Sequence, residues 1–278
     1  MIGTPKAGLS KISSLSSSRY SFNLQSLKKS ETYHVQSNDL NHGYDGPLHV
    51  SYGDSDYKLA DDYIEAAKRN GLGSTIDVND FHTVNKAGRW PKWINPETSK
   101  RSDAAHGFVH PVGGNLLLLT ECKVVRILFE GTRAVGVETS KLRIHARRFA
   151  IISAGALSTP QILQRSGIGD AANLNALNIP VIASLPGVGQ NYQDHQLLGK
   201  AAYRVDAPLD DTVTVVFRGS TEALADRPLA RNYVDAGIKL RPTEEEVLQM
   251  GPAFQKVWKE FFLGKPDKPV MWIGMFST

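Results

Sequence analysis

An apolar run that ends at small residues is the feature of this sequence with the clearest chemical meaning. Residues 149–152 read Phe-Ala-Ile-Ile, and Ser153, Ala154 and Gly155 follow directly. Small side chains at the end of a strand let a planar ligand approach the backbone, and a helix that begins there presents free N–H groups. An ordinary strand–helix turn has a similar composition, so the wider motif has to decide between a binding turn and a structural one.

A pair of histidines is the other candidate for chemistry. His106 and His110 are four residues apart, a spacing that can place two metal ligands on one face of a helix. However, Gly107 and Pro111 argue against a regular helix, and no glutamate accompanies the pair as it does in zinc proteases. The sequence therefore predicts no metal centre here.

Composition limits the classes of partner. The chain has 278 residues, enough for one large domain or two moderate ones. Hydrophobic residues make up 41% and charged residues 22%, which is ordinary for a globular protein. The net charge of +4 is spread over interspersed basic and acidic residues, and no apolar run approaches the roughly 20 residues of a membrane-spanning helix. We therefore expect neither nucleic acid nor membrane as a partner.

Cysteine usage and the chain termini bear on the cellular compartment. Cys122 is the only cysteine, so the chain can form neither an intramolecular disulfide nor a cysteine-based zinc cluster, which favours an intracellular location. Residues 1–30 are rich in Ser and Lys and contain no acidic residue. We expect a disordered tail there rather than a transit peptide. The last residues, Phe276-Ser277-Thr278, are not a peroxisomal Ser-Lys-Leu signal.

Hydrophobic periodicity predicts most of the elements that would position the candidate turn. The alternation predicts a strand at 48–52, and helical spacing predicts a helix at 59–67 that ends at Gly71. Residues 72–106 are expected to form a long loop with short elements. Strands are expected at 124–129, 134–138 and 143–148, after a short apolar run at 116–120.

The region around the candidate turn reads as strand, turn and helix. The continuously apolar residues 149–152 predict a strand buried on both faces of a parallel sheet. Ser158 is the predicted N-cap of the following helix, with Pro160 in its first turn and Gly167 at its end. Later, a capping box at residues 243–246 predicts another helix start, with a kink at Gly251-Pro252.

Residues 155–169 decide in favour of the binding turn. They read Gly-Ala-Leu-Ser-Thr-Pro-Gln-Ile-Leu-Gln-Arg-Ser-Gly-Ile-Gly, and these fifteen positions resemble, in order, a motif of the glucose–methanol–choline (GMC) oxidoreductases. Further segments resemble the family in the same order along the chain, at residues 101–106, 115–138 and 185–195. Residues 93–95, 236–246 and 265–269 resemble in particular the fungal methanol (alcohol) oxidase branch. The resemblance covers about residues 28–278.

This resemblance implies an α/β (α+β) fold that combines part of a Rossmann-like FAD-binding domain with part of a substrate-binding domain. Residues 31–105 would form a linker and flavin-cover segment, 106–200 the second part of the FAD-binding domain, and 201–278 the start of the substrate-binding domain. FAD would be the cofactor. The full-length parent would oxidise a short primary alcohol such as methanol with O2, giving aldehyde and hydrogen peroxide.

The resemblance also implies individual site residues. Val124 would offer its backbone N–H and C=O to the adenine ring, and the backbone of Ala154 and Gly155 would line the flavin. Asn191 lies in a segment that returns beneath the flavin in the family and is a further candidate. Asp194 and His195 of the same segment are expected to satisfy each other and neighbouring backbone groups.

Two parts of the family pattern have no match in this sequence. The Gly-x-Gly-x-x-Gly turn that binds the FAD diphosphate is absent, because the nearest candidate, Gly187-Val188-Gly189, continues as Gln-Asn-Tyr. No histidine matches the catalytic motif, which in the family lies near the C-terminus. We therefore expect an internal stretch of an alcohol oxidase that on its own shows neither a flavin absorbance band nor alcohol-dependent peroxide.

Two alternatives stay open at this point. The chain could be an inactive truncated remnant or an interaction module, or it could belong to another branch, such as the aryl-alcohol oxidases or choline-type dehydrogenases. A chain that lacks half of its sheet partners leaves apolar strand faces and edges uncovered. We therefore expect poor solubility or a dependence on self-association as a homo-oligomer.

Overall fold

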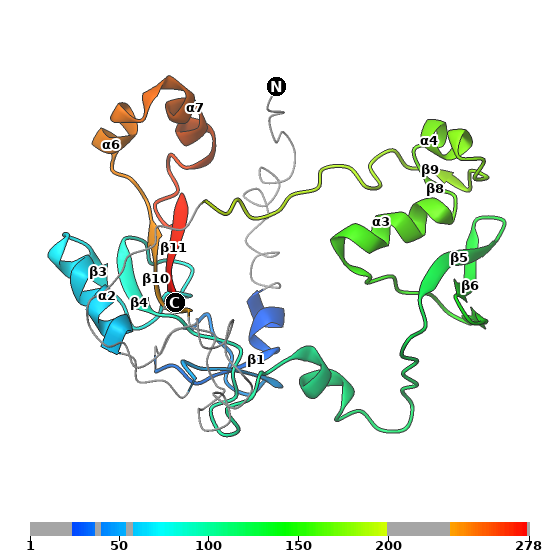
Figure 1. Ribbon diagram of the computed structural model, residues 1–278, viewed down its shortest axis with the longest axis horizontal. Coiled ribbons are helices and arrows are strands. Elements are labelled where there is room, and N and C mark those ends of the chain that lie inside the picture. Colours follow the sequence, from blue (N-terminus) through cyan, green and yellow to red (C-terminus); the bar gives the residue numbers. More distant parts are fainter. Residues whose placement is uncertain (1–23, 37–39, 54–57, 199–233, 277–278) are drawn as a thin grey trace, which may run out of the picture. The chain divides into compact units, whose positions relative to one another are not determined.

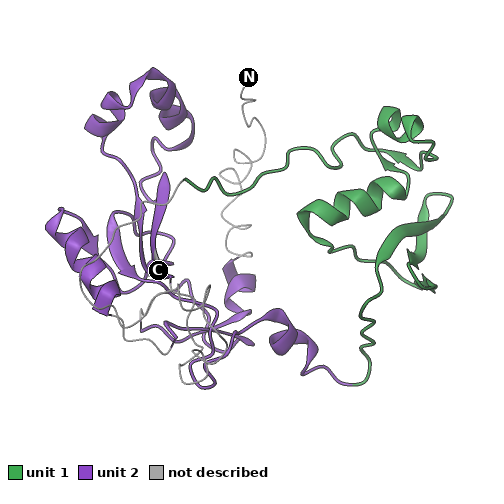
Figure 2. Ribbon diagram, in the orientation of Figure 1, with its two compact units in different colours: residues 1–5, 114–202 green, residues 6–113, 203–278 purple. Residues whose placement is uncertain are grey.

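A computed structural model of the chain describes residues 24–36, 40–53, 58–198 and 234–276. Two compact units make up these residues (Figures 1 and 2). The described part of unit 1 is residues 114–198, and unit 2 contains the remaining described residues. Most of the predicted tail, residues 1–23, and residues 199–233 at the predicted start of the substrate-binding domain lie outside the described residues.

Unit 1 begins with a three-stranded antiparallel sheet. Its strands are β5 (Val124–Glu130), β6 (Arg133–Thr139) and β7 (Arg143–His145). A tight turn at Gly131 joins the first two, as the sequence predicts, because glycine accepts the positive φ of +60° found there. The predicted third strand is shorter than expected, since pairing with β6 ends at His145.

Helix α3 (Gly155–Arg165) packs against β5. It is followed by β8 (Ile168–Gly169), α4 (Ala171–Ala176) and β9 (Ala183–Ser184), and β8 pairs with β9 in parallel. The small core of the described part of unit 1 contains Ile127, Ile162 and Leu174, one from β5 and one from each helix. Each of these three elements thus contributes one buried apolar side chain.

Two local predictions for unit 1 were wrong. Residues 149–152 form no strand and are not buried on both faces, because no described strand lies beside them to pair. Helix α3 begins at Gly155, three residues before the predicted cap, so Ser158 and Pro160 both lie inside it. The apolar residues 116–120 form no regular element, and their four leucines are 45–80% exposed.

Unit 2 is built around a four-stranded sheet in the order β11-β10-β4-β3. The strands are β3 (Gly73–Ser74), β4 (Lys86–Arg89), β10 (Val234–Leu240) and β11 (Met271–Phe276). The predicted helix is α2 (Lys58–Arg69), which packs against β3, β4 and β10. Its buried Ala60 contacts the fully buried Ala236 of β10, so two small residues allow the helix to lie close to the sheet.

Two further helices follow β10. Helix α6 (Glu244–Gln249) starts at the predicted capping box, in which Thr243 Oγ1 accepts from the Glu246 N–H and the Glu246 carboxylate accepts from the Thr243 N–H. Helix α7 (Gly251–Phe261) begins at the predicted kink, where Gly251 has a φ of +83°. Trp258 of α7 is buried, and the Arg241 guanidinium lies 4.3 Å from the centre of its ring.

The remaining elements of unit 2 are short. Strands β1 (Glu31–Tyr33) and β2 (Leu48–Val50) pair in parallel, and Ala105–Val109 form a π-helical turn. No helix within the described ranges has the length and apolar character to cross a membrane. The mixture of helices and strands confirms the predicted α/β class. The longer strands, β5, β6, β10 and β11, pair in antiparallel fashion.

Candidate functional site

The turn that leads into α3 is open and rich in hydrogen-bond donors. Ala154 and Gly155 are both exposed, Gly155 has a φ of +85°, and a Cβ atom added there would meet nothing within 4 Å. No side chain caps the helix, whereas the Ala154 N–H donates to Thr159 Oγ1 over 3.0 Å. The first N–H groups of an α-helix have no partner within the helix, so they are available to a ligand here.

Exposed apolar side chains flank this turn in the sequence. Phe149, Ile151 and Leu157 are 69%, 75% and 65% exposed. Solvent exposure of several large apolar side chains on one stretch is characteristic of a surface that another group covers. The combination of apolar side chains with free backbone donors suits a planar, partly polar ring system.

Val124, the predicted adenine contact, lies at the start of β5. It is half-buried and pairs with Thr139 of β6. The register shifts immediately afterwards, because Arg126 pairs with Glu138, which leaves Val125 as an extra residue in a β-bulge. Thus the backbone next to the predicted adenine contact departs from regular pairing.

Gln164 of α3 contacts the segment that carries Asn191. The Gln164 amide donates to the Val188 carbonyl over 3.4 Å, and Gly189 lies against the same amide. Asn191 adopts a left-handed conformation with a φ of +55°, and its Oδ1 accepts from Gln193 Nε2 over 3.2 Å. Unit 1 therefore contains all four predicted site residues, but within its described part no hydrogen bond joins the Asn191 side chain to β5 or α3.

The Asp194 carboxylate contacts neighbouring groups of its own loop. Asp194 Oδ1 accepts from the backbone N–H of His195 over 2.7 Å, and Oδ2 accepts from the Tyr192 hydroxyl over 3.2 Å. Both residues are exposed. The carboxylate is thus used locally to shape the loop.

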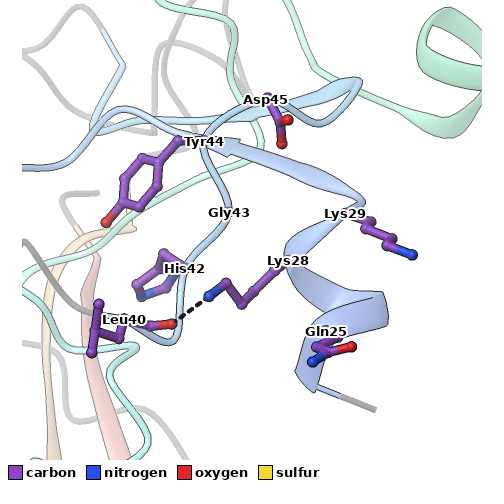
Figure 3. Close-up of a pocket in the computed structure, with 8 residues that line it drawn as sticks. All are labelled: Gln25, Lys28, Lys29, Leu40, His42, Gly43, Tyr44 and Asp45. Carbon is purple, nitrogen blue, oxygen red and sulfur yellow. Dashed lines mark hydrogen bonds between the residues drawn. The ribbon is translucent and has the colours of Figure 1, made fainter. Parts of the chain in front are cut away.

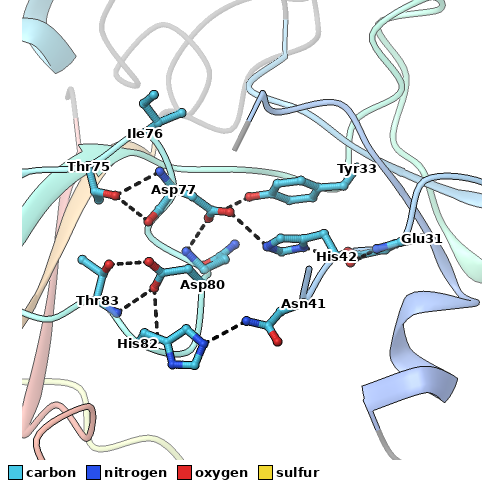
Figure 4. A network of polar contacts seen from close by, with 12 residues as sticks. Glu31, Tyr33, Asn41, His42, Thr75, Ile76, Asp77, Asp80, His82 and Thr83 are labelled. Atoms are coloured by element: carbon cyan, nitrogen blue, oxygen red, sulfur yellow. Dashed lines mark hydrogen bonds and ion pairs between the residues drawn. The ribbon is translucent and has the colours of Figure 1, made fainter. Parts of the chain in front are cut away.

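A buried polar cluster in unit 2 was not predicted from the sequence (Figure 4). The His42 ring places Nδ1 2.9 Å from Glu31 Oε1 and Nε2 3.0 Å from Asp77 Oδ2. Its ring stacks on Tyr33 with centroids 3.6 Å apart, and the Tyr33 hydroxyl donates to Asp77 Oδ1 over 2.8 Å. We call Glu31, Tyr33, His42 and Asp77 the His42 cluster. Its members lie up to 46 residues apart in sequence, so no local spacing reveals it.

The charges in the His42 cluster depend on one another. Burial lowers the pKa of His42, but its contacts with Asp77 and Glu31 outweigh this effect and raise the pKa to about 9. Burial and the hydrogen bond to Asp77 both raise the pKa of Tyr33, which stays protonated. For Asp77, burial opposes ionisation, but the bonds from His42, the Asn79 N–H and Tyr33 leave its pKa lowered. At neutral pH, His42 is therefore an imidazolium held between two carboxylates.

A pocket of about 500 Å³ lies beside this cluster (Figure 3). Its lining combines polar and apolar groups: Gln25, Lys28, Lys29, Leu40, His42, Gly43, Tyr44 and Asp45. The Lys28 ammonium donates to the Leu40 carbonyl over 2.7 Å, and both His42 nitrogens contact carboxylates. Lys28 and His42 of the pocket lining thus already contact oxygen atoms of the protein.

Metal-binding chemistry finds no support in the described ranges. Among these residues, no group of three or more His, Cys, Asp or Glu side chains could hold a metal ion. His106 Nδ1 instead contacts Asp103 Oδ1 at 2.8 Å, and the His106 and His110 rings meet edge-on with centroids 4.7 Å apart.

The family assignment comes from sequence comparison. A sequence model of the GMC oxidoreductases matches residues 11–197, which is more than half of the chain. The chain belongs to the GMC oxidoreductase family. This match includes β5, α3 and the 185–195 segment, and therefore all four predicted site residues of this GMC oxidoreductase.

Sequence similarity to two oxidoreductases supports this assignment. The chain is 38% identical to an alcohol oxidase from Pichia angusta over 278 residues, covering 90% of this chain and 41% of that protein. It is 44% identical to mitochondrial choline dehydrogenase from Homo sapiens over 159 residues, covering 55% of this chain and 26% of that protein. This GMC chain thus spans about two fifths of the length of the alcohol oxidase.

A solved structure shows the same fold. An FAD-dependent oxidoreductase from Chaetomium thermophilum matches 92% of this GMC chain and 53% of its own, with a TM-score of 0.71 and 22% sequence identity. At that identity the likeness concerns the fold alone. The likeness to this solved structure therefore confirms the α/β class predicted from the sequence.

Proposed function

We propose that this GMC chain supplies the adenine side and the ring side of an FAD site in an oxidase of short primary alcohols. Family membership indicates FAD as the cofactor, and the alcohol oxidase from Pichia angusta matches 90% of the chain. Bound FAD would accept hydride from the alcohol and pass electrons to O2, so that aldehyde and hydrogen peroxide are the products.

The open turn at Ala154 and Gly155 is the observation that carries this proposal. The residues present fit a flavin ring, because a Cβ atom added to Gly155 would meet only open space and the α3 N–H groups lack a capping side chain. A ring pressed against this backbone would occupy the space where any larger residue would project. Exposed Phe149 and Ile151 would supply apolar contacts to the same ligand.

Each proposed site residue would bind or orient rather than transfer a proton. The N–H and C=O of Val124 would hold the adenine, and the backbone of Ala154 and Gly155 would hold the ring. Asn191 would contribute from the 185–195 segment through its amide side chain. In the described part of the chain we place no catalytic acid or base, since the His42 ring nitrogens both contact carboxylates and no histidine matches the family's catalytic motif.

Choline-type oxidation is the second candidate function. The choline dehydrogenase match has the higher identity, 44%, but it covers only 55% of the chain. The alcohol oxidase match extends across the segments at 93–95 and 236–246 that resemble the methanol oxidase branch. We therefore favour a short uncharged alcohol over a cationic one.

A chimeric enzyme tests the proposal directly. The matching region of the Pichia angusta alcohol oxidase is replaced by this chain, and the purified protein is assayed for bound flavin and for peroxide with methanol, ethanol, benzyl alcohol and choline. We expect bound flavin and peroxide with the two short alcohols. The unfused chain serves as a control and should show neither.

Two results would count against the proposal. A chimera that melts cooperatively but purifies without flavin would contradict the assignment of the FAD site. A flavin-bound chimera that oxidises choline or benzyl alcohol but not methanol would retain the cofactor site and contradict the substrate class.

A further inference from the structure

The β-bulge at Val125 is held from outside its own sheet. Val124 pairs with Thr139 and Arg126 with Glu138, so Val125 has no residue opposite it on β6. Its carbonyl instead accepts from Nε of Arg165, at the last residue of α3, over 3.0 Å. Bulges re-aim the backbone locally, and a bulge that is fixed by a charged donor keeps one orientation.

A buried hydroxyl fixes the same strand two residues later. Ser166 Oγ accepts from the Ile127 N–H over 2.7 Å and donates to the Ile162 carbonyl over 2.6 Å. Ser166 is only 6% exposed, and Ile127 and Ile162 beside it are also buried. One hydroxyl therefore links the backbone of β5 to the backbone of α3.

These contacts give α3 two functional ends. Its N-terminal end carries Gly155 of the proposed ring side, and its C-terminal end holds β5 immediately after Val124 of the proposed adenine side. An α-helix of 11 residues is rigid and spans about 16 Å. The helix thereby sets the separation between the two halves of the site.

We propose that Arg165 and Ser166 are positioning residues that lock the Val125 bulge and so present the backbone of Val124 to the adenine of a dinucleotide. The inference rests on the proposed function and extends it. The site would recognise a flavin cofactor through an adenine end held at a fixed distance from the ring. The affinity for a ligand that contains adenine would then depend on Arg165, whereas the affinity for a ligand that contains only the flavin ring would not.

The test compares ligand affinities of the chimeric enzyme with its FAD removed, carrying either the unaltered chain or one of three variants of it. Arg165→Met removes the donor and keeps the aliphatic stem, Arg165→Lys keeps one donor, and Arg148→Met is the control for loss of charge, because Arg148 is exposed in the same unit. Adenosine and riboflavin are titrated separately and followed by saturation-transfer NMR of the ligand, which tolerates self-associated protein. Adenosine carries no phosphate, so loss of the arginine charge cannot weaken binding simply by removing an attraction to a ligand phosphate.

We expect Arg165→Met to weaken adenosine binding about three- to tenfold, the effect of losing one charge-assisted hydrogen bond, and to leave riboflavin binding unchanged. Arg165→Lys should recover part of the affinity, and Arg148→Met should match the unaltered chain. Hydrogen exchange at the Ile127 amide should stay slow in Arg165→Met, because its bond to Ser166 remains.

Three outcomes overturn the inference, and one of them also concerns the proposed function. Equal adenosine affinity in Arg165→Met and the unaltered chain would show that the bulge needs no clamp, while the FAD assignment would stand. Parallel losses for adenosine and riboflavin would show a purely structural role. No adenosine binding by the chimera that carries the unaltered chain would contradict the adenine assignment itself.

Discussion

At the residue scale, His42 is the side chain whose charge state is most strongly set by its surroundings. It contacts Glu31 through one ring nitrogen and Asp77 through the other, and it is 5% exposed. Removing one partner of a buried pair leaves an uncompensated charge, which is costly. The His42 cluster thus links β1 to the loop that contains Asp77.

This arrangement predicts a stability that depends on pH. Because the pKa of His42 is about 9 in the folded chain and 6.5 when unperturbed, its contribution is complete below pH 6.5 and is lost as pH rises through 9. The gain corresponds to on the order of 3 kcal/mol. The lowered pKa of Asp77 adds stability above about pH 3.8 that is lost in stronger acid.

The measurement is thermal unfolding of the chain between pH 5 and pH 10, compared with His42→Gln. The unaltered chain should lose stability between roughly pH 6.5 and 9, whereas the variant should be less stable below pH 6.5, show a flatter profile over that range, and differ least from the unaltered chain above pH 9. A matched control is His145→Gln, because His145 is an exposed residue of β7. Parallel pH profiles for all three proteins would contradict the charge assignment of His42.

A glycine pair provides a second residue-scale prediction. Gly155 and Gly131 both have positive φ, +85° and +60°, and a Cβ atom added to either meets nothing within 4 Å. Gly→Ala at either position should therefore cost a similar 1–2 kcal/mol, roughly the penalty for a left-handed residue. In the chimeric enzyme we expect Gly155→Ala to reduce bound flavin per protein, and Gly131→Ala to retain it. Equal flavin content in both variants would argue that the ring does not rest on Gly155.

At the element scale, the sequence predicts those elements whose signals are local. The 124–139 hairpin, helix α2 with Gly71 and the capping box before α6 were all confirmed, because alternation, helical spacing and capping residues act over a few positions. The strand predicted at 149–152 was wrong for the opposite reason. A buried parallel strand needs neighbours from elsewhere in the chain, and the described part contains none beside it.

The candidate site was predictable to a similar extent. The motif at 155–169 located the open turn, and the match of the GMC family model to residues 11–197 confirmed the family. The roles of Val124, Ala154, Gly155 and Asn191 stay predictions. The Val125 bulge and its bond to Arg165 could not be predicted, because a bulge depends on strand register and the bond joins residues 40 positions apart.

The capping box of helix α6 allows a quantitative test of how much a local signal contributes to stability. Thr243→Ala removes the side chain that accepts from the Glu246 N–H and should destabilise the fold by about 1 kcal/mol. Thr243→Ser keeps the hydroxyl and should restore most of the loss. Chemical denaturation of the chain measures both, and equal midpoints for the alanine variant and the unaltered chain would show that the capping box does not contribute to stability.

At the scale of the whole molecule, unit 1 exposes several large apolar side chains. Leu117, Leu118, Phe149, Ile151 and Leu197 are all at least 64% exposed. Monomeric proteins rarely leave so many large apolar groups in contact with water. In the described part of unit 2, β11 is an outer strand of its sheet, and its Trp272 and Ile273 are exposed.

We therefore expect the chain alone to self-associate or to precipitate. Sedimentation velocity at several protein concentrations should give species heavier than the 30.5 kDa monomer, with a distribution that shifts to larger species as concentration rises. We expect fusion into the chimeric enzyme to suppress this association, because the added alcohol oxidase segments would pack on the exposed apolar groups. A monodisperse monomer that melts cooperatively would contradict this expectation.

Photolabelling of the chimeric enzyme tests most directly whether β5 and α3 hold the two ends of one flavin dinucleotide. FAD that carries an azide on its adenine is bound, irradiated and mapped by peptide mass spectrometry. The account predicts a label within residues 123–126 that excess FAD removes by competition. A competed label on unit 2, or on unit 1 away from the start of β5, would contradict it.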